Sequence, residues 1–532
     1  MNRMDKNKLL FFPFFLGIIL MVYSWYLSYP LSIDSLGDFV FNHVSIAYWI
    51  SLPLTLVPMY LISLNTKSNT LRWLITVIAV LTMYSLSYFY PMVPGSDSHY
   101  FRGMNEYFSK TGDLTPFGPK HLYFQWPLFF LLIDMSTSLI GISLVSFEFV
   151  LYTIIGFLLA TAMYIYVSKA YSQSGFLAVV SSFIVMFYFL NFQCVPFSFA
   201  FSFLFLLFML EAQCITSLER TFATIILFTA ITLTHSFVGM FFVLYEFICY
   251  VLNRKRMRFR LFVLTLMIYL AVLFFQAELS FAQIINTILS ASPDYGMKIA
   301  TTIKPSSVPL DVIAQLFSRF VVIGTTLLCL AGFIFLYLKR GIRLLDKAVF
   351  LSGALYLGVG SLVLLLGLRA LPLVIVPVSL GAAYIIESRI RPYLKYLFLV
   401  LLLLFVFIPI HSSFNDSQIF FQTEEAYRTE NFMIDHYNWT NSGRILAHIR
   451  VINYLQAKQP SAAHYESDFS VLFPRIKDYD SIVYTVGLGK NLLRYNYTTE
   501  RILREEKLNV LYNNGFSYIA TKSSNFTWAP TR

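Results

Sequence analysis

The sequence predicts an all-α polytopic membrane protein with about 13 spanning helices, followed by a small C-terminal α/β domain. Of its 532 residues, 57% are hydrophobic and only 13% are charged, and the mean hydropathy is +0.66. A soluble domain carries about 25% charged residues, and a soluble chain of this length could not bury so much apolar surface. Apolar runs recur up to residue 411, whereas charged residues are about twice as frequent in residues 412–532.

Residues 1–411 form the expected membrane domain. Its first apolar run follows the N-terminal residues MNRMDKNK and is too long for the core of a signal peptide, so we expect it to be the first spanning helix. The apolar runs cover residues 9–30, 46–64, 73–92, 127–146, 147–168, 175–191, 196–211, 221–252, 261–280, 319–338, 348–366, 373–388 and 396–411.

The basic residues indicate which loops face the cytoplasm. The net charge of +11 does not point to nucleic acid, because the basic residues cluster in short loops between apolar runs, as the positive-inside rule describes. The strongest cluster lies at 254–260, and others lie at 339–347 and 389–395. The chain is therefore expected to be a multi-pass protein of the cell membrane with a cytoplasmic N-terminus. On this topology the extracytoplasmic parts are loops 93–125 and 281–318, the 367–372 turn and everything after residue 411.

Two arrangements satisfy the odd number of crossings required between loop 93–125 and Arg254. In the first, 127–146 is a surface or re-entrant helix and 221–252 is two short helices, which places His235 outside. In the second, 127–146 spans fully and 221–252 is one bent helix. We favour the first arrangement because it keeps two further basic residues cytoplasmic, Lys169 and Arg220.

The tail, residues 412–532, is expected to be an extracytoplasmic soluble domain. Ile482–Val486 and Ser517–Thr521 resemble strands, and Thr498–Tyr512 resembles a helix that ends at Asn513-Asn514-Gly515. Glycosylation sequons occur in this tail and nowhere else in the chain, which agrees with an external location. They begin at Asn415, Asn438, Asn496 and Asn525.

External loop 93–125 contains the most informative stretch for chemistry. Ser96 or Asp97 can cap a helix that runs to about Lys110, with an aromatic face that would lie on the membrane surface. The helix dipole favours an ionised carboxylate at Asp97. That carboxylate could accept a proton from an attacking hydroxyl, or hold a divalent metal ion (Mg, Mn or Zn) together with His99. The alternative is that Asp97 only caps the helix.

This loop resembles the first large external loop of the GT-C class of membrane glycosyltransferases, which includes protein O-mannosyltransferases and the lipid A aminoarabinose transferase. The resemblance lies in a G-x-D sequence, a surface helix, a T-G-D turn and a Tyr-x-x-Trp-Pro sequence before the next apolar run. It implies that Asp97 is the catalytic base or a metal partner. The matching residues are Gly95, Asp97, Gly112, Tyr123, Trp126 and Pro127.

Later parts of the chain resemble the same class. Thr234 and His235 end an apolar run, and Arg369 precedes a Pro-containing helix, where the family's basic residue contacts the lipid phosphate. The planar guanidinium of an arginine suits phosphate oxygens, although an interfacial Arg369 could also serve only as a membrane anchor. Lys298 and Lys304 are weaker candidates for the same contact. His235 could hydrogen-bond the phosphate or the substrate, or be satisfied by backbone groups at a helix end.

The resemblance implies an inverting glycosyltransferase that moves a sugar from a polyprenyl- or dolichyl-phosphate donor to an acceptor hydroxyl. The expected partners are that lipid-linked donor, membrane lipids and a protein, lipid or glycan acceptor. A transporter or lipid flippase is the main alternative and would use intramembrane acids for ion coupling. A polysaccharide polymerase or ligase, with basic residues in loop 281–318, is another, and a structural scaffold is a third. The candidate acids for transport are Glu148, Glu211 and Glu246.

Overall fold

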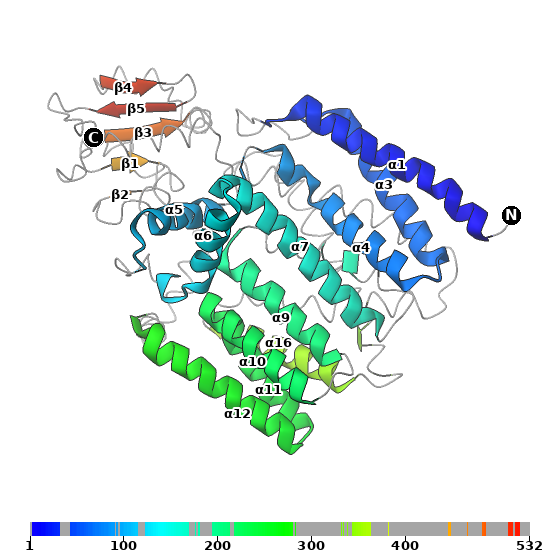
Figure 1. The fold of residues 1–532 in the computed structure, drawn as a ribbon, viewed down its shortest axis with the longest axis vertical. Helices are drawn as coiled ribbons and strands as arrows, with labels where there is room; N and C mark the ends of the chain where they lie inside the picture. The colour runs from blue at the N-terminus through cyan, green and yellow to red at the C-terminus, as the bar shows by residue number, and fades with distance from the viewer. Residues whose placement is uncertain are drawn as a thin grey trace.

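A computed structural model shows a mostly helical chain with a small sheet near one end (Figure 1). It describes isolated residues between 176 and 381 and the eight segments and five strands listed here: 3–31, 43–90, 92–93, 96–114, 123–169, 194–212, 217–279, 343–362, 445–447, 465–466, 481–485, 509–513 and 517–521.

The helices follow the apolar runs of the sequence closely but differ from them at several ends. Predicted run 396–411 and all but isolated residues of runs 175–191, 319–338 and 373–388 lie outside the described residues. The described helices are α1 Arg3–Ser28, α3 Ile46–Asn65, α4 Asn69–Met83, the 3-10 helix η1 Ser85–Phe89, α5 Ser96–Thr111, α6 Leu128–Ile140, α7 Leu144–Ser168, α9 Pro196–Ala212, α10 Ser217–Thr234, α11 Ser236–Leu252, α12 Arg256–Ala271, the π-helix η3 Val272–Gln276 and α16 Leu344–Leu362.

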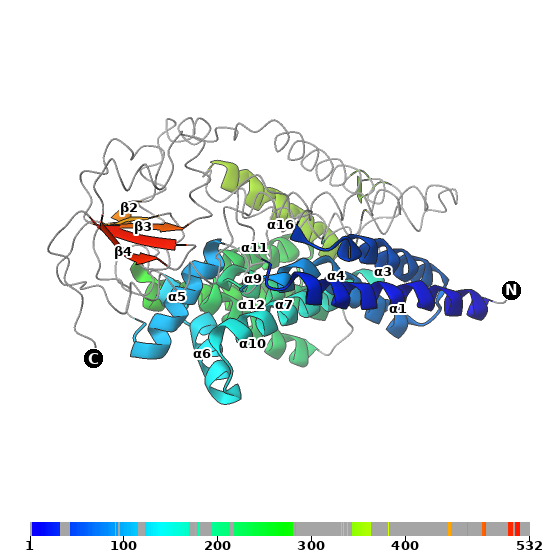
Figure 2. The same cartoon turned by 90° about the horizontal axis from the view of Figure 1, so that it is seen from above.

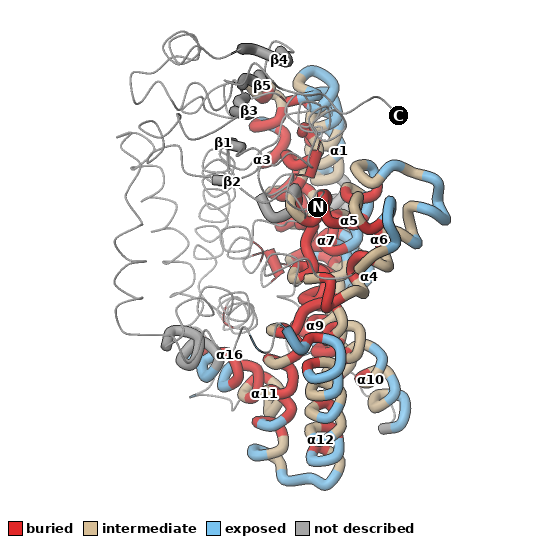
Figure 3. Tube along the Cα trace, turned by 90° about the vertical axis from the view of Figure 1, so that its left-hand side faces the viewer, coloured by how far each residue is buried: buried red, intermediate tan, exposed pale blue. Residues whose placement is uncertain are grey.

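Four helical segments in the described part of the chain are long and apolar enough to cross a membrane: Leu9–Ser28, Ile46–Asn65, Leu144–Ser168 and Arg256–Gln276. The first and last of these are mostly exposed within the structure and carry large apolar side chains on their exposed faces. Such faces are costly in water and are suited to lipid. The buried residues instead run along α7, α9 and α11 (Figure 3). Figure 2 shows these helices in one layer, with α16 on one side of it, where it packs against α11.

The boundary between α6 and α7 differs from the prediction, which placed it between residues 146 and 147. Helix α6 ends at Gly141, whose φ of 72° is a left-handed conformation that glycine adopts without strain. The Oγ of Ser143 then accepts a hydrogen bond from the amide of Ser146 and begins α7. With 13 residues, α6 is about 20 Å long, less than the ~30 Å hydrocarbon core. This length agrees with the arrangement in which this segment does not span fully.

The run 221–252 is two helices rather than one bent helix. Helix α10 ends at Thr234 and α11 begins at Ser236, and between them His235 has extended backbone angles, φ −162° and ψ 112°. The polar sequence Thr234-His235-Ser236 interrupts the apolar run at this point. The favoured arrangement therefore has the helix break that it requires, with α10 of 18 residues and α11 of 17 residues.

The basic cluster at 254–260 is partly helical, which corrects its interpretation as a loop. Helix α12 begins at Arg256, five residues before the predicted apolar run at 261, and so includes Arg258 and Arg260. The apolar pattern of the sequence does not reveal this start, because the buried residue of the first turn, Arg258, is charged. It is buried because it pairs with two glutamates. The run at 73–92 is likewise divided, with α4 ending at Met83 and η1 following.

The tail contains a five-stranded mixed sheet in the order β2-β1-β3-β5-β4. Strand β1 pairs in parallel with both β2 and β3, and β5 pairs antiparallel with both β3 and β4. In Figures 1 and 2 the sheet lies at the end of the molecule that carries α5. The strands are β1 Ile445–Ala447, β2 Tyr465–Glu466, β3 Ser481–Thr485, β4 Asn509–Asn513 and β5 Ser517–Thr521.

One tail prediction is wrong at its C-terminal end. Residues 509–512 were expected to finish a helix, but they belong to strand β4, which pairs with β5. The Asn-Asn-Gly sequence was interpreted as a helix stop. It lies between two antiparallel strands instead, where Asn-Gly is also a strong hairpin signal. The rest of the predicted helix lies outside the described residues.

Candidate functional site

The predicted loop helix is present as α5, Ser96–Thr111. Asp97 lies in its first turn, the position that the dipole argument requires. The side chains of Asp97 and His99 are outside the described part of the structure, and so are Arg369 and Lys298 as whole residues. The structure therefore describes the backbone of Asp97 and the helix that contains it, together with the predicted residues Tyr123 and His235.

One face of α5 is aromatic, as the sequence predicts, but this face packs on α6 within the protein, whereas the prediction placed it on the membrane surface. The ring of Phe101 lies 6.1 Å from that of Phe129 and 6.2 Å from that of Phe130, measured between centroids. Met104 and Phe108 on the same face are also buried. The helix differs from the predicted surface helix in that a second, polar face is buried too.

The buried polar face of α5 centres on Arg102. Its Nε lies 2.9 Å from Oε2 and 3.1 Å from Oε1 of Glu148 in α7, and its Nη2 also pairs with Oε2. Nη1 of Arg102 contacts the sulfur of Met92 at 2.9 Å. One turn earlier, the Oγ of Ser98 accepts a hydrogen bond from the amide of Cys194 at 3.1 Å. These contacts hold α5 against α7 and the segment that precedes α9.

The sequence analysis did not single out Arg102, although two signals were present. Ser98, Arg102, Asn105 and Ser109 recur at helical spacing beside the aromatic stripe, which marks a second continuous face. Glu148 lies in an apolar run and requires a partner of opposite charge when buried. The two residues are 46 positions apart, and nothing in the sequence alone pairs them.

Tyr123 and His235, far apart in the chain, lie close together at this end of the bundle. Their ring centroids are 6.4 Å apart. Tyr123 makes an edge-on contact with Phe101 of α5 at 4.8 Å, and His235 makes one with Phe197 in the first turn of α9 at 5.2 Å. The break between α10 and α11 thus places the buried imidazole of His235 beside Tyr123, which itself contacts α5.

Trp126 extends this aromatic group toward the end of α12. Its ring lies 6.1 Å from that of Tyr123, and it packs in a small buried cluster with Leu273 and Ala277, where the α-helix gives way to the π-helix η3. The indole Nε1 of Trp126 is buried and has no hydrogen-bond partner within the described part of the chain. Single π-helical turns are frequent at functional sites, and a buried N–H donor without an acceptor is costly.

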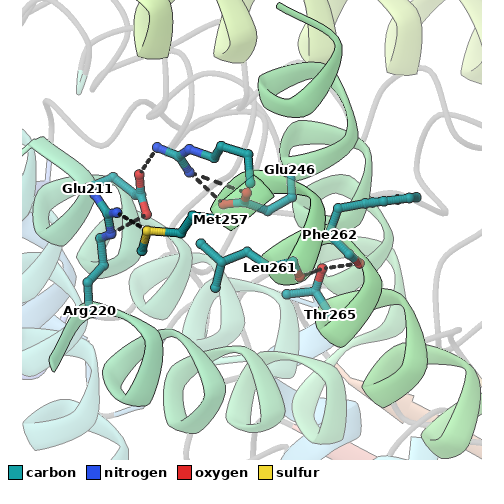
Figure 4. A network of polar contacts seen from close by, with 8 residues as sticks. Glu211, Arg220, Glu246, Met257, Leu261, Phe262 and Thr265 are labelled. Atoms are coloured by element: carbon teal, nitrogen blue, oxygen red, sulfur yellow. Dashed lines mark hydrogen bonds and ion pairs between the residues drawn. The ribbon is translucent and has the colours of Figure 1, made fainter. Parts of the chain in front are cut away.

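The opposite end of the bundle carries a larger buried ionic network, in which two arginines and two glutamates come from four helices. Arg258 of α12 lies 2.5 Å from Oε2 of Glu211 in α9 and 3.2 Å from Oε1 of Glu246 in α11. Arg220 of α10 approaches Glu211 at 3.8 Å, and Figure 4 shows these two residues beside Glu246. These pairs connect four helices through opposite charges.

Two further contacts connect this end to the other basic segments. Tyr166 of α7 donates a hydrogen bond to Asp346 of α16, which also pairs with Arg343 at 2.8 Å. Tyr164 donates to the carbonyl of Asn69, at the start of α4, at 3.2 Å. The segments that begin near Arg72, Arg220, Arg258 and Arg343 therefore share one end, opposite α5.

The metal prediction rests on Asp97 and His99, whose side chains are not described. Among the described residues, no group of three or more His, Cys, Asp or Glu side chains could hold a metal ion. Two of the four cysteines, Cys194 and Cys249, are described, and both are buried free thiols that pack as small apolar residues.

Comparison with known proteins adds no relative at this point. No protein-family model matches the chain, and no curated protein matches its sequence. The functional interpretation therefore depends on the residues and their geometry.

Proposed function

We propose that this protein is a membrane glycosyltransferase that moves a sugar from a polyprenyl- or dolichyl-phosphate donor to an acceptor hydroxyl, with inversion. The proposal rests on one observation: the α5 segment packs beside His235, the residue at which the run 221–252 is broken into two helices. Two short sequence features that resemble separate parts of the GT-C class, Tyr123 and His235, have rings 6.4 Å apart. Phe101, one turn after Asp97, contacts the same Tyr123.

The proposed topology places α5, Tyr123 and His235 outside and the basic end of the bundle in the cytoplasm. The segregation of the two ends supports it, because the segments beginning near Arg72, Arg220 and Arg258 lie together and away from α5. The proposal keeps about 13 spans in residues 1–411 and an extracytoplasmic α/β tail from 412 to 532. In that tail, the five strands support a compact domain.

In the proposed reaction, Asp97 accepts the proton of the acceptor hydroxyl as its oxygen attacks the anomeric carbon. The bond between that carbon and the phosphate oxygen breaks, and the lipid phosphate leaves with the electron pair. Arg369 offsets the charge that develops on the leaving phosphate, which is the larger electrostatic contribution. His235 and Trp126 are proposed to donate hydrogen bonds to the phosphate or the sugar, with Lys298 as a further phosphate contact. In the alternative role of Asp97, it and His99 would hold a divalent metal ion, which would supply charge stabilisation.

The three glutamates that a transporter would use for ion coupling all have arginine partners in the structure. Glu148 pairs with Arg102, and Glu211 and Glu246 both pair with Arg258. A buried carboxylate paired in this way is accounted for by helix packing. These contacts support the transferase over the transporter.

The test is sugar transfer by the purified full-length protein from a panel of radiolabelled polyprenyl-phosphate sugars. We expect Asp97→Asn to lower turnover by roughly 10²- to 10⁴-fold, the usual contribution of a general base. Asp134→Asn, which removes a nearby acid of α6 outside the features that carry the resemblance, is the control and should retain turnover. Arg369→Ala should lower turnover and Arg369→Lys should restore part of it. Consumption of no donor by wild type, or equal turnover by Asp97→Asn and Asp134→Asn, would reject the proposal.

A further inference from the structure

A groove of about 420 Å³ lies where the end of α1 meets η1 and the first turns of α7. Two contacts fix its geometry. The indole Nε1 of Trp25 donates to the carbonyl of Tyr88 at 2.9 Å, and the amide of Leu31 donates to the carbonyl of Phe89 at 2.7 Å. The groove is lined by Met21, Val22, Trp25, Tyr29, Ser85, Tyr88, Phe89, Tyr90 and Phe149.

The polar groups of this lining are largely engaged within the protein. The Oγ of Ser85 donates to the carbonyl of Thr82 at 2.6 Å and lies 3.2 Å from the hydroxyl of Tyr48. The hydroxyl of Tyr88 forms a hydrogen bond with the hydroxyl of Thr153, and the Trp25 indole already donates to the Tyr88 carbonyl. The surface left for a ligand is therefore aromatic and aliphatic, which favours a hydrocarbon over a sugar or a phosphate.

The groove is continuous with the exposed apolar face of α1. Val22, at its rim, is 61% exposed, and Ile19, one turn away on the same helix, is 63% exposed. This face belongs to a segment long and apolar enough to span a membrane. Hydrocarbon chains that cover such a face reach the groove directly.

We propose that this groove binds one hydrocarbon chain of a bilayer phospholipid. Among the described residues that line the groove none is charged, so they offer no counter-charge for the phosphate of a lipid-linked sugar donor. A phospholipid chain needs none, because its headgroup stays at the surface while the chain enters between α1 and η1. Trp25 and Tyr29 lie at the end of α1, where aromatic residues favour the membrane–water interface. The proposal is independent of the transferase function.

The experiment uses the full-length protein in nanodiscs of phosphatidylcholine that contain a small fraction of phosphatidylcholine with a diazirine in one acyl chain. After photolysis, we expect labelled residues to concentrate on the groove-lining segments 21–29 and 85–90 and at Phe149. Val22→Trp places a large ring at the rim and should lower this labelling roughly tenfold. The ring would exclude about two methylene groups of the lipid chain, and each buried methylene stabilises binding enough for two to account for that factor. Ile19→Trp makes the same change on the exposed face outside the lining and should leave the labelling unchanged.

Two results would overturn the proposal. One is labelling spread evenly over the exposed face of α1, or lowered equally by both tryptophan variants, since either would mean unspecific lipid contact. The other is displacement of the label by stoichiometric polyprenyl phosphate, which would assign the groove to a lipid-linked donor instead. A Val22→Trp protein that does not fold is replaced by Val22→Phe, with Ile19→Phe as its control.

Discussion

Arg102 of α5 and Glu148 of α7 form a buried ion pair in which the arginine Nε lies within 3.1 Å of both carboxylate oxygens. Both side chains are almost completely inaccessible, at 0% and 2%. The pair joins α5, which has Asp97 in its first turn, to one of the span-length helices, α7. The position of Asp97 thus depends on a contact between two oppositely charged groups within the helical core.

Glu148→Gln should strongly destabilise the protein, because it leaves the Arg102 charge buried without a counter-charge. The expected loss is about 3–5 kcal/mol in the free energy of unfolding. The double variant Arg102→Met/Glu148→Leu should recover most of it, since neither charge remains. Denaturant titration in detergent, followed by circular dichroism, measures both. Ser109→Ala removes an exposed hydrogen bond from the same helix to Asp134 and should stay within about 0.5 kcal/mol of wild type. An equal loss in that control would contradict the prediction.

Arg258→Met should be the most destabilising change at the opposite end of the bundle. It leaves two buried carboxylates, Glu211 and Glu246, without their principal partner, with an expected loss of about 3–5 kcal/mol. Arg220→Met should cost only about 0–1 kcal/mol, because Arg220 is 20% exposed and lies 3.8 Å from Glu211. Thermal unfolding in detergent compares these variants with Arg260→Met, an exposed residue of the same helix. The assignment fails when Arg258→Met and Arg260→Met unfold at the same temperature.

Gly17→Ala should weaken the packing of α1 on α3. A Cβ at this position would lie 2.9 Å from the backbone nitrogen of Thr55 and also meet its Oγ1, so the helices must separate. The expected cost is about 1–3 kcal/mol. Gly156→Ala is the matched control in α7, because its Cβ would meet only a side-chain carbon of Leu81 at 3.6 Å.

The two alanine variants should change the free energy of unfolding in opposite directions. Without a clash, a Gly→Ala change inside a helix stabilises by roughly 0.5–1 kcal/mol, and Gly156→Ala is expected to do so. Unfolding temperatures in detergent and the efficiency of a cross-link engineered between α1 and α3 measure the effect. A Gly17→Ala protein with unchanged stability and cross-linking would show that α1 does not pack at this distance.

Cysteine labelling from the two sides of the membrane should separate the two ends of the bundle. In a background without native cysteines, Lys67→Cys and Lys255→Cys should react with an impermeant maleimide only from the cytoplasmic side. Lys110→Cys, in the last turn of α5, should react only from outside. All three side chains are exposed in the structure, so access does not limit the reaction. Reaction of Lys67→Cys and Lys110→Cys from the same side would invalidate the topology.

Much of the helical architecture could be predicted, because a long apolar run in the sequence predicts an apolar helix of about the same length. Helices α3 and α9 begin and end within a residue of the predicted runs. The helix α5 was also predicted closely, since a capping residue and an aromatic stripe define it locally. The boundary at Gly141 was missed because the apolar run continues through it, although glycine followed by Ser143 is a local signal.

By itself, the sequence determined the class of this protein, because the apolar content and the basic loops are properties of composition and order that need no tertiary contact. It also predicted the helix α5 with Asp97 near its start, and it favoured, without deciding, a break in the run 221–252. Only the tertiary structure decided that Tyr123 lies beside His235, that Arg102 pairs with Glu148 and that Arg258 pairs with two glutamates. These partners come from different helices, and the packing of those helices, rather than any local pattern, sets which side chains meet.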